Sequence, residues 1–304
     1  MGTAPVSGNS VPPVPGDAVV LDHVAVAVEA WADAWGRYVV ELGGRWASGG
    51  LNVGFGPAQL RFANDARVEV LQPWQAEANP FLRRFLDTNG PGPHHLTFKV
   101  PDIAHALEAA ASAGFTAVQV DLSDPEWKEA FLHPRQATGV VVQMAQAAGS
   151  WESPPPEGFP TDAPHGAPAA FTHVTHAVAD LDDALALFSG LLGGELAERH
   201  HDTGAGWHGV TLRWPGPLGL RLITPTGDRH GVDAPGSALH RWLGDRPGRV
   251  HHLAFARTGP LDPGSGPEPA EAPVPGVTEA EQPLYVVAPE DNLGARLVVR
   301  RSLQ

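Results

Sequence analysis

The sequence predicts a mixed α+β protein built from four βαβββ modules that form two similar domains with curved mixed sheets. Four strand-like segments each begin with a histidine followed by alternating apolar residues, at 21–28, 93–100, 172–179 and 251–256. A second short apolar strand follows each of these histidines 46 to 48 residues later. A fixed spacing that recurs four times indicates a repeated structural unit.

Stretches rich in proline and glycine separate the repeats into two blocks of similar size. We therefore expect a flexible tail at 1–17, a first domain at 18–148, a proline-rich linker at 149–168 and a second domain at 169–304. The chain has 304 residues, which is a comfortable length for two hydrophobic cores. The tail has neither the basic nor the apolar region of a signal peptide.

Apolar residues at helical spacing predict a helix after the histidine strand in the first three modules, at 31–44, 102–114 and 181–194. The fourth module shows no evident helix, and a proline-rich stretch at 258–280 interrupts it. Short β-strands are expected at 51–56, 58–63, 67–73, 116–121, 130–134, 139–146, 208–214, 218–225, 283–289 and 295–301.

Composition excludes several classes of function. The formal net charge of −14 disfavours nucleic acid and membrane surfaces as partners, because both attract basic patches. The absence of cysteine excludes disulfides and thiolate chemistry. No apolar run approaches the roughly 20 residues that cross a bilayer. We expect a cytoplasmic protein, a monomer or homodimer, whose partner is a small-molecule substrate.

The residues at the two repeated positions of each module, the histidine and the one 46 to 48 residues later, are suited to a metal ion in the first half. They are His23, Glu69, His95 and Gln143. Two imidazoles, a carboxylate and an amide oxygen suit Zn, Co, Ni, Mn or Fe(II) better than Ca or Mg. Alternation along the strands predicts that His95 faces the site and that its neighbour His94 points the other way.

The same positions of the second half read His173, Arg221, His252 and Val298, which is a degenerate site. The guanidinium of Arg221 lies where a metal ion would sit, so we expect it to pair with an acidic side chain. Binding of a carboxylate or phosphate is the alternative. Another three histidines, His200, His201 and His208, fall in a stretch that the sequence predicts to be a glycine-rich loop.

The fourfold pattern resembles the vicinal oxygen chelate superfamily, which includes glyoxalase I, methylmalonyl-CoA epimerase, extradiol dioxygenases and bleomycin- and fosfomycin-resistance proteins. The first half is most similar to the epimerases, through residues 68–73, 79–103 and 133–146. The resemblance implies that His23, Glu69, His95 and Gln143 are metal ligands. It also implies that Glu69 acts as the catalytic base.

Two departures from the epimerase pattern affect the expected activity. Gln143 replaces a glutamate in the last strand, and the stretch 46–53 lacks the second acid/base carboxylate of an epimerase. Racemisation needs proton transfer on both faces of a carbon, and Glu69 serves one. We expect a metal-dependent lyase or isomerase of glyoxalase or epimerase type. An Fe(II) dioxygenase and a ligand-binding or resistance protein without turnover are the alternatives. Candidate substrate contacts are Arg83, Lys128 and Arg135.

Overall fold

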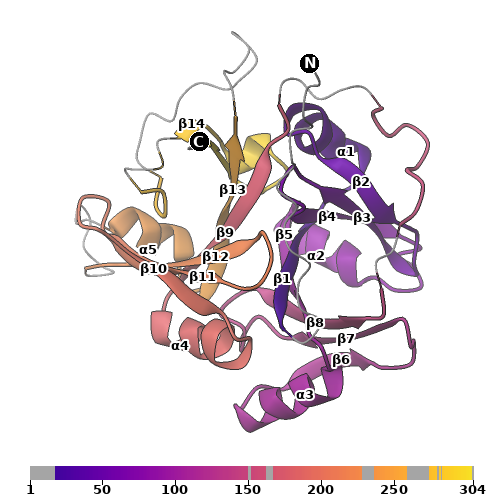
Figure 1. Ribbon diagram of the computed structural model, residues 1–304, viewed down its shortest axis with the longest axis horizontal. Coiled ribbons are helices and arrows are strands. Elements are labelled where there is room, and N and C mark those ends of the chain that lie inside the picture. Colours follow the sequence, from indigo (N-terminus) through magenta and orange to yellow (C-terminus); the bar gives the residue numbers. More distant parts are fainter. Residues whose placement is uncertain are drawn as a thin grey trace, which may run out of the picture.

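The computed structural model describes residues 18–149, 152–161, 167–227, 236–258, 274–278, 281 and 283–302. These residues form two mixed β-sheets that lie side by side, each flanked by short helices (Figure 1). The strand order is β2-β3-β4-β1-β5-β8-β7-β6 in the first sheet and β10-β11-β12-β9-β13-β15-β14 in the second. The predicted α+β class is therefore confirmed. The expected tail at 1–17 lies outside the described residues.

The first sheet contains the histidine strands of modules one and two at its centre. Its strands are β1 (Val20–Ala27), β2 (Arg45–Gly49), β3 (Gly54–Arg61), β4 (Arg67–Trp74), β5 (Gly92–Lys99), β6 (Ala117–Asp121), β7 (Trp127–Leu132) and β8 (Val141–Ala147). Its helices are α1 (Ala32–Ala34), which continues as the π-helical η1 (Trp35–Glu41), α2 (Phe81–Asn89) and α3 (Ile103–Ser112).

The second sheet repeats this order with one strand fewer among the described residues. Its strands are β9 (Ala170–Val178), β10 (Glu195–Asp202), β11 (Trp207–Arg213), β12 (Gly219–Pro225), β13 (Gly248–Arg257), β14 (Pro283–Val287) and β15 (Leu297–Arg301). Its helices are α4 (Leu181–Leu185), the π-helical η2 (Ala186–Leu191), α5 (Ser237–Leu243) and the 3-10 turn η4 (Pro289–Asp291). Most of the stretch at 258–280, which interrupts the fourth module, lies outside the described residues.

The structure corrects a predicted break in a strand and a predicted loop. β3 runs unbroken from 54 to 61 through Pro57, whose carbonyl accepts from the backbone N–H of Gly50. The loop expected around His200 and His201 is instead β10, which pairs with β11. A tight turn at 203–206 joins these two strands, so the glycines there end the strand and do not mark a long loop.

Alternation along β1 separates two environments. Val24 and Val26 point into the main hydrophobic core. Ala25 and Ala27 point to the opposite face, where they pack under Leu82 and other side chains of α2. We call this second face, which also carries His23, Glu69 and His95, the site face. Because α2 covers one end of it with apolar side chains, the polar residues of the site face gather at the other end.

The two sheets share one core, formed by the faces opposite to the site face and its counterpart. The ring of Phe62 lies 5.0 Å from that of Phe255, and Phe98 lies 5.2 Å from Trp214. The described part of the linker packs on the first sheet, because the ring of Phe159 contacts both Trp35 and Trp46. The two halves therefore contact each other through buried side chains, not only through the linker.

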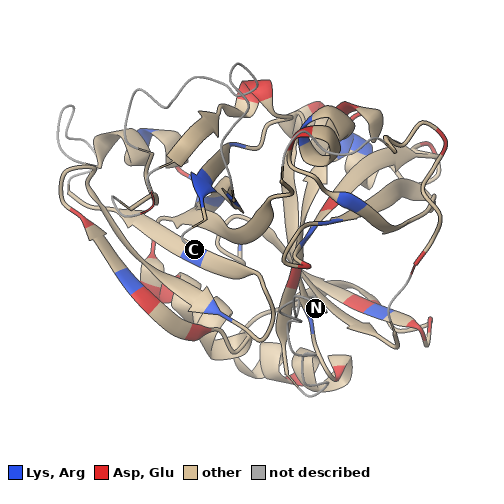
Figure 2. Ribbon diagram, turned by 45° about the horizontal axis from the view of Figure 1, so that its top comes forward, with Lys and Arg blue, Asp and Glu red and all other residues tan. Residues whose placement is uncertain are grey.

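Acidic and basic residues are interspersed along both halves (Figure 2). Within the described part of the chain, none of the helices has the length and apolarity needed to traverse a membrane.

Candidate functional site

Three of the four predicted ligands of the first half converge on one point. His23 on β1 and His95 on β5 each place Nε2 3.6 Å from Oε2 of Glu69 on β4. The potential ligand atoms all lie within 4.8 Å of one another. All three side chains are buried. Strand pairing explains the convergence, because Ala25 of the central strand β1 lies opposite both Glu69 and His95.

Two β-bulges place an orienting side chain beside each of these histidines. The pairing of β1 with β5 slips at Asp22 and again at His94. The carboxylate of Asp22 lies 2.7 Å from Nδ1 of His23, and Nδ1 of His94 lies 2.8 Å from Nδ1 of His95. The prediction that His94 points away from His95 is wrong, because the bulge breaks the alternation. His94 packs instead against Phe85 of α2, 4.7 Å away.

These contacts leave the two Nε2 atoms free. Nε2 of His23 and Nε2 of His95 are buried and have no hydrogen-bond partner. A 3.6 Å separation from Glu69 is too long for a hydrogen bond. A tetrahedral ion with ligand distances near 2.1 Å holds its ligands about 3.4 Å apart. Two unpaired imidazole nitrogens and one carboxylate oxygen at this spacing therefore fit a divalent transition metal.

Burial and charge act against each other in this site. Burial alone would lower the pKa of His23, but the charge of Glu69 and the contact with Asp22 raise the pKa to about 9. Burial alone would raise the pKa of Glu69, but His23 lowers it to about 2. Burial holds the pKa of His95 well below its usual value. These directions favour an ion pair between His23 and Glu69 when no metal is bound, across the 3.6 Å contact, and a neutral His95.

Gln143 lies on the same sheet, and both ends of its amide are engaged. Its Oε1 accepts from the hydroxyl of Thr97 at 2.6 Å, and its Nε2 donates to Glu129 at 2.6 Å. Glu129 also accepts from the indole N–H of Trp127 at 2.8 Å. The amide oxygen retains one lone pair, so a role of Gln143 as fourth ligand remains a prediction. Glu129 is a second carboxylate on the site face that the sequence pattern did not reveal.

The three predicted substrate contacts lie in different surroundings. Arg83 on α2 is engaged by Glu29 and Asp87, at 2.6 and 2.8 Å. Lys128 alternates with Glu129 on β7, so its side chain starts from the opposite face of the sheet. Arg135 lies in the turn after β7, and its backbone N–H donates to His133. None of these three side chains makes a hydrogen bond or ion pair with the first site (His23, Glu69 and His95).

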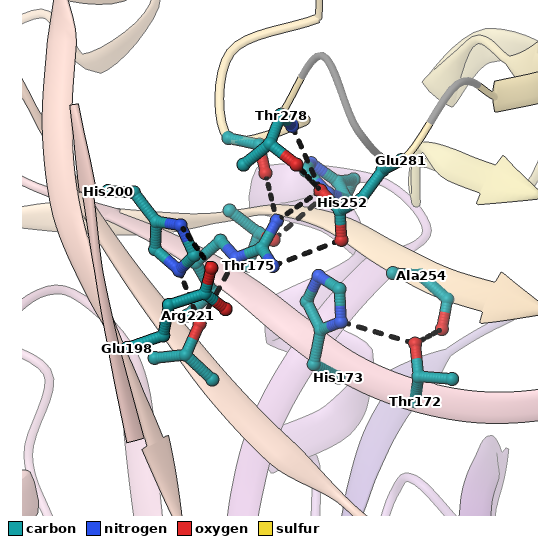
Figure 3. Close-up of polar contacts among 12 residues, drawn as sticks. Thr172, His173, Thr175, Glu198, His200, Arg221, His252, Ala254, Thr278 and Glu281 are labelled. Carbon is teal, nitrogen blue, oxygen red and sulfur yellow. Dashed lines mark hydrogen bonds and ion pairs between the residues drawn. The ribbon is translucent and has the colours of Figure 1, made fainter. Parts of the chain in front are cut away.

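The second site contains an ion pair where the first has its carboxylate. The buried guanidinium of Arg221 makes two bonds to Glu281, at 2.6 and 3.0 Å, and a third to the carbonyl of Gly276 (Figure 3). This arrangement matches the expected pairing with an acidic side chain. Burial and Arg221 hold the pKa of His173 well below its usual value. His252 bonds to the hydroxyl of Thr175 at 2.9 Å. A cation of the chain thus occupies the centre of this site.

The bulges recur in the second sheet, but the orienting residues differ. Thr172 stands beside His173, with its hydroxyl 3.2 Å from Nδ1, and His251 stands beside His252 at 2.9 Å. His200 of β10 is buried and bonds to Thr211, close to Arg221. The first site has an aspartate where the second has a threonine, which is a further difference between the two repeats.

Comparison with known proteins confirms the resemblance for the first domain. Residues 22–131 match the model of the Glyoxalase/Bleomycin resistance protein/Dioxygenase superfamily. This range includes His23, Glu69 and His95 but ends before Gln143. No curated protein matches the chain.

Several solved structures are similar to parts of the chain. A mutant of 4-hydroxymandelate synthase from Streptomyces coelicolor matches with a TM-score of 0.57 and 17% identity, covering 79% of this chain and 72% of that one. Methylmalonyl-CoA epimerase from Mycobacterium tuberculosis matches with a TM-score of 0.39 and 24% identity, covering 47% and 94%. A hypothetical protein from Bacillus halodurans C-125 matches with a TM-score of 0.40 and 24% identity, covering 44% and 99%. The match to the synthase spans both sheets and supports a repeated two-sheet fold.

Proposed function

We propose that the first domain (18–148) binds one divalent transition-metal ion at His23, Glu69 and His95. With this ion it catalyses a lyase or isomerase reaction. The observation that carries this proposal is the pair of buried, unpartnered Nε2 atoms, each 3.6 Å from the same carboxylate oxygen. In an apolar protein interior such atoms are costly unless something binds them. Zn, Co, Ni, Mn and Fe(II) all accept this ligand set, with Gln143 as a fourth ligand.

A divalent cation at this site supplies a Lewis acid that stabilises negative charge on a substrate oxygen. The residues of the chain hold and move the protons. Glu69 would first have to release the ion, after which its Oε2 could accept a proton from the carbon next to that oxygen. Its Oε1 accepts from the amide of Gln59 at 3.3 Å, which would hold the carboxylate in place. Asp22 and His94 keep the two histidines oriented throughout.

One well-placed base favours a lyase or a one-faced isomerase over a racemase. Glu69 is the carboxylate beside the two free imidazole nitrogens, whereas Glu129 is bonded to Gln143 and Trp127. Under this proposal the second domain is a structural partner that needs no metal, since Arg221 and Glu281 neutralise each other there.

The test is proton exchange. Protein loaded with zinc or cobalt is incubated in D₂O with a panel of small 2-oxo and 2-hydroxy compounds, and C–H exchange is followed by NMR. We expect exchange of the proton next to the chelating oxygen, lost in Glu69→Gln and after EDTA. Exchange that persists in Glu69→Gln would contradict the role of this base.

Two other outcomes would support the alternative functions. Oxygen uptake by the Fe(II)-loaded protein, without exchange, would favour a dioxygenase. Tight ligand binding that survives EDTA, without turnover, would favour a binding or resistance protein.

A further inference from the structure

Two cations border the first site, and the proposed chemistry uses neither. Nζ of Lys99 lies 3.1 Å from Oδ1 of Asp22, and Nη1 of Arg67 lies 3.8 Å from the same oxygen. The side chains of Lys99 and Arg67 are 30% and 26% exposed, whereas His23 is 1% exposed. Both cations are therefore accessible to a bound molecule. Both also lie near His23, a buried histidine of the proposed metal site.

Strand register places both cations on the site face. Arg67 precedes Glu69 by two residues on β4, and Lys99 follows His95 by four residues on β5. Residues an even number apart on a strand point to the same face. Arg67 also lies directly opposite His23 in the pairing of β4 with β1. Both cations therefore share the site face with the two Nε2 atoms, and they are connected to His23 through Asp22, which lies at its Nδ1.

The charges around the site favour an anion once a metal is bound. Asp22 and Glu69 balance Lys99 and Arg67, so the two positive charges of a divalent ion are left over. Glu129 on β7 neutralises only one of these two positive charges. A concave site with excess positive charge attracts and orients anions.

We propose that the substrate carries a carboxylate, separate from the oxygens that bind the metal, and that Lys99 and Arg67 bind this carboxylate. This inference rests on the proposed metal site and adds the substrate class. The planar guanidinium of Arg67 offers paired N–H donors, and Lys99 adds a point charge. Asp22 holds both cations in place before the substrate arrives.

The first experiment uses the fact that the sequence has two lysines, Lys99 and Lys128. Reductive methylation with ¹³C-formaldehyde labels both ε-amines and keeps their charge. The probes are 2-oxoglutarate and pyruvate, which share the vicinal oxygens but differ in the second carboxylate. On the zinc-loaded protein we expect 2-oxoglutarate to shift the Lys99 signal and leave the Lys128 signal unchanged. Pyruvate should shift neither. Variants Lys99→Arg and Lys128→Arg assign the signals.

The second experiment measures affinity by calorimetry on the zinc-loaded protein. We expect 2-oxoglutarate to bind at least about tenfold more tightly than pyruvate, since an added charge-assisted contact is worth about that much. Lys99→Met and Arg67→Met should each reduce this preference, whereas the control Lys128→Met should keep it.

Equal affinities for the two probes, no binding of either probe, or a preference that survives both substitutions would overturn the inference. If the protein binds no zinc, the proposed metal site itself fails. If it binds zinc but shows no preference, only the carboxylate inference fails.

Discussion

We expect His23 to hold a proton in the metal-free protein, which a metal ion at the proposed site would displace. Its pKa is raised to about 9, chiefly because Glu69 offsets the cost of burial, while Glu69 remains ionised down to about pH 2. Metal binding therefore releases this proton at any pH below about 9. We expect affinity for zinc or cobalt to rise about tenfold per pH unit towards pH 9 and then to level off.

Competition with a chelator of known affinity between pH 6 and 9.5 measures this dependence. Affinity of the wild-type protein that stays constant between pH 7 and pH 9 would contradict the protonated state of His23.

Asp22 fixes which nitrogen of His23 faces the site. Its contact with Nδ1, at 2.7 Å, leaves Nε2 as the metal-facing atom. Loss of such an orienting contact lowers metal affinity by about 10- to 100-fold. We expect Asp22→Ala to have this effect in a chelator competition. Thr172→Val, the equivalent change beside His173, should leave affinity unchanged. Equal affinities of wild type and Asp22→Ala would show that Asp22 does not orient the ligand.

The repeat pattern predicted which side chains converge, but it did not reveal their supporting residues. His23, Glu69 and His95 occupy equivalent places in repeated strands, so their positions follow from the spacing alone. Asp22 and His94 sit in β-bulges, where period-two alternation gives the wrong face. Glu129 is recognised only once Gln143 is seen to donate to it.

At the scale of elements, helices and strands followed from periodicity except where local geometry departs from it. The helices after β1 and β9 were predicted at the right places, but both continue as π-helical turns that periodicity does not indicate. β10 was missed because its outward side chains are polar and its end is rich in glycine. Pro57 was expected to interrupt the strand. β3 nevertheless continues through it, because on that side only the carbonyl of Pro57 takes part in hydrogen bonding.

The segment that carries Glu281 is attached to β12 through a buried ion pair. Arg221 and Glu281 are 6% and 11% exposed, so removal of one partner leaves a charge uncompensated in the interior. Such losses cost about 3–5 kcal/mol. We expect Glu281→Ala to lower the free energy of unfolding in urea by that amount. The double variant Arg221→Met, Glu281→Met should recover most of it. A near-wild-type stability of Glu281→Ala would show that the pair does not hold this segment.

At the scale of the whole molecule, two glycines mark a close approach of the halves. A Cβ added to Gly139 would lie 1.9 Å from the carbonyl oxygen of Gly248 on β13. Nearby, the ring of His176 is 2.8 Å from the carbonyl of Thr138. The sequence predicted two domains and a linker, but it did not predict this contact, because no local pattern encodes which faces of separate sheets meet.

This contact can be tested with a matched pair of substitutions. Gly139 and Gly114 share the same left-handed backbone, with φ of +87° and +85°, but Gly114 has open space around it. Alanine at either position carries the backbone strain of about 1–2 kcal/mol. Gly139→Ala adds a clash with the backbone of Gly248. We therefore expect it to lower the free energy of unfolding in urea by about 1–3 kcal/mol more than Gly114→Ala does. Equal losses would show that the halves do not meet at this point.

The two halves share a topology but differ in the charge at the centre of each site. The first site places a carboxylate between two free imidazoles, and the second places a guanidinium that its own chain neutralises. The same scaffold thus leaves a position for one cation in the first half and supplies a cation in the second. We therefore expect one metal ion per chain.

The most direct measurement is a crystal structure of the protein grown with cobalt or zinc, with diffraction recorded on both sides of the metal's absorption edge. We predict a single anomalous peak, about 2.0–2.2 Å from Nε2 of His23, Nε2 of His95 and an oxygen of Glu69, and no peak beside Arg221. A structure without a peak among these three side chains, or with the metal bound elsewhere, would contradict the account.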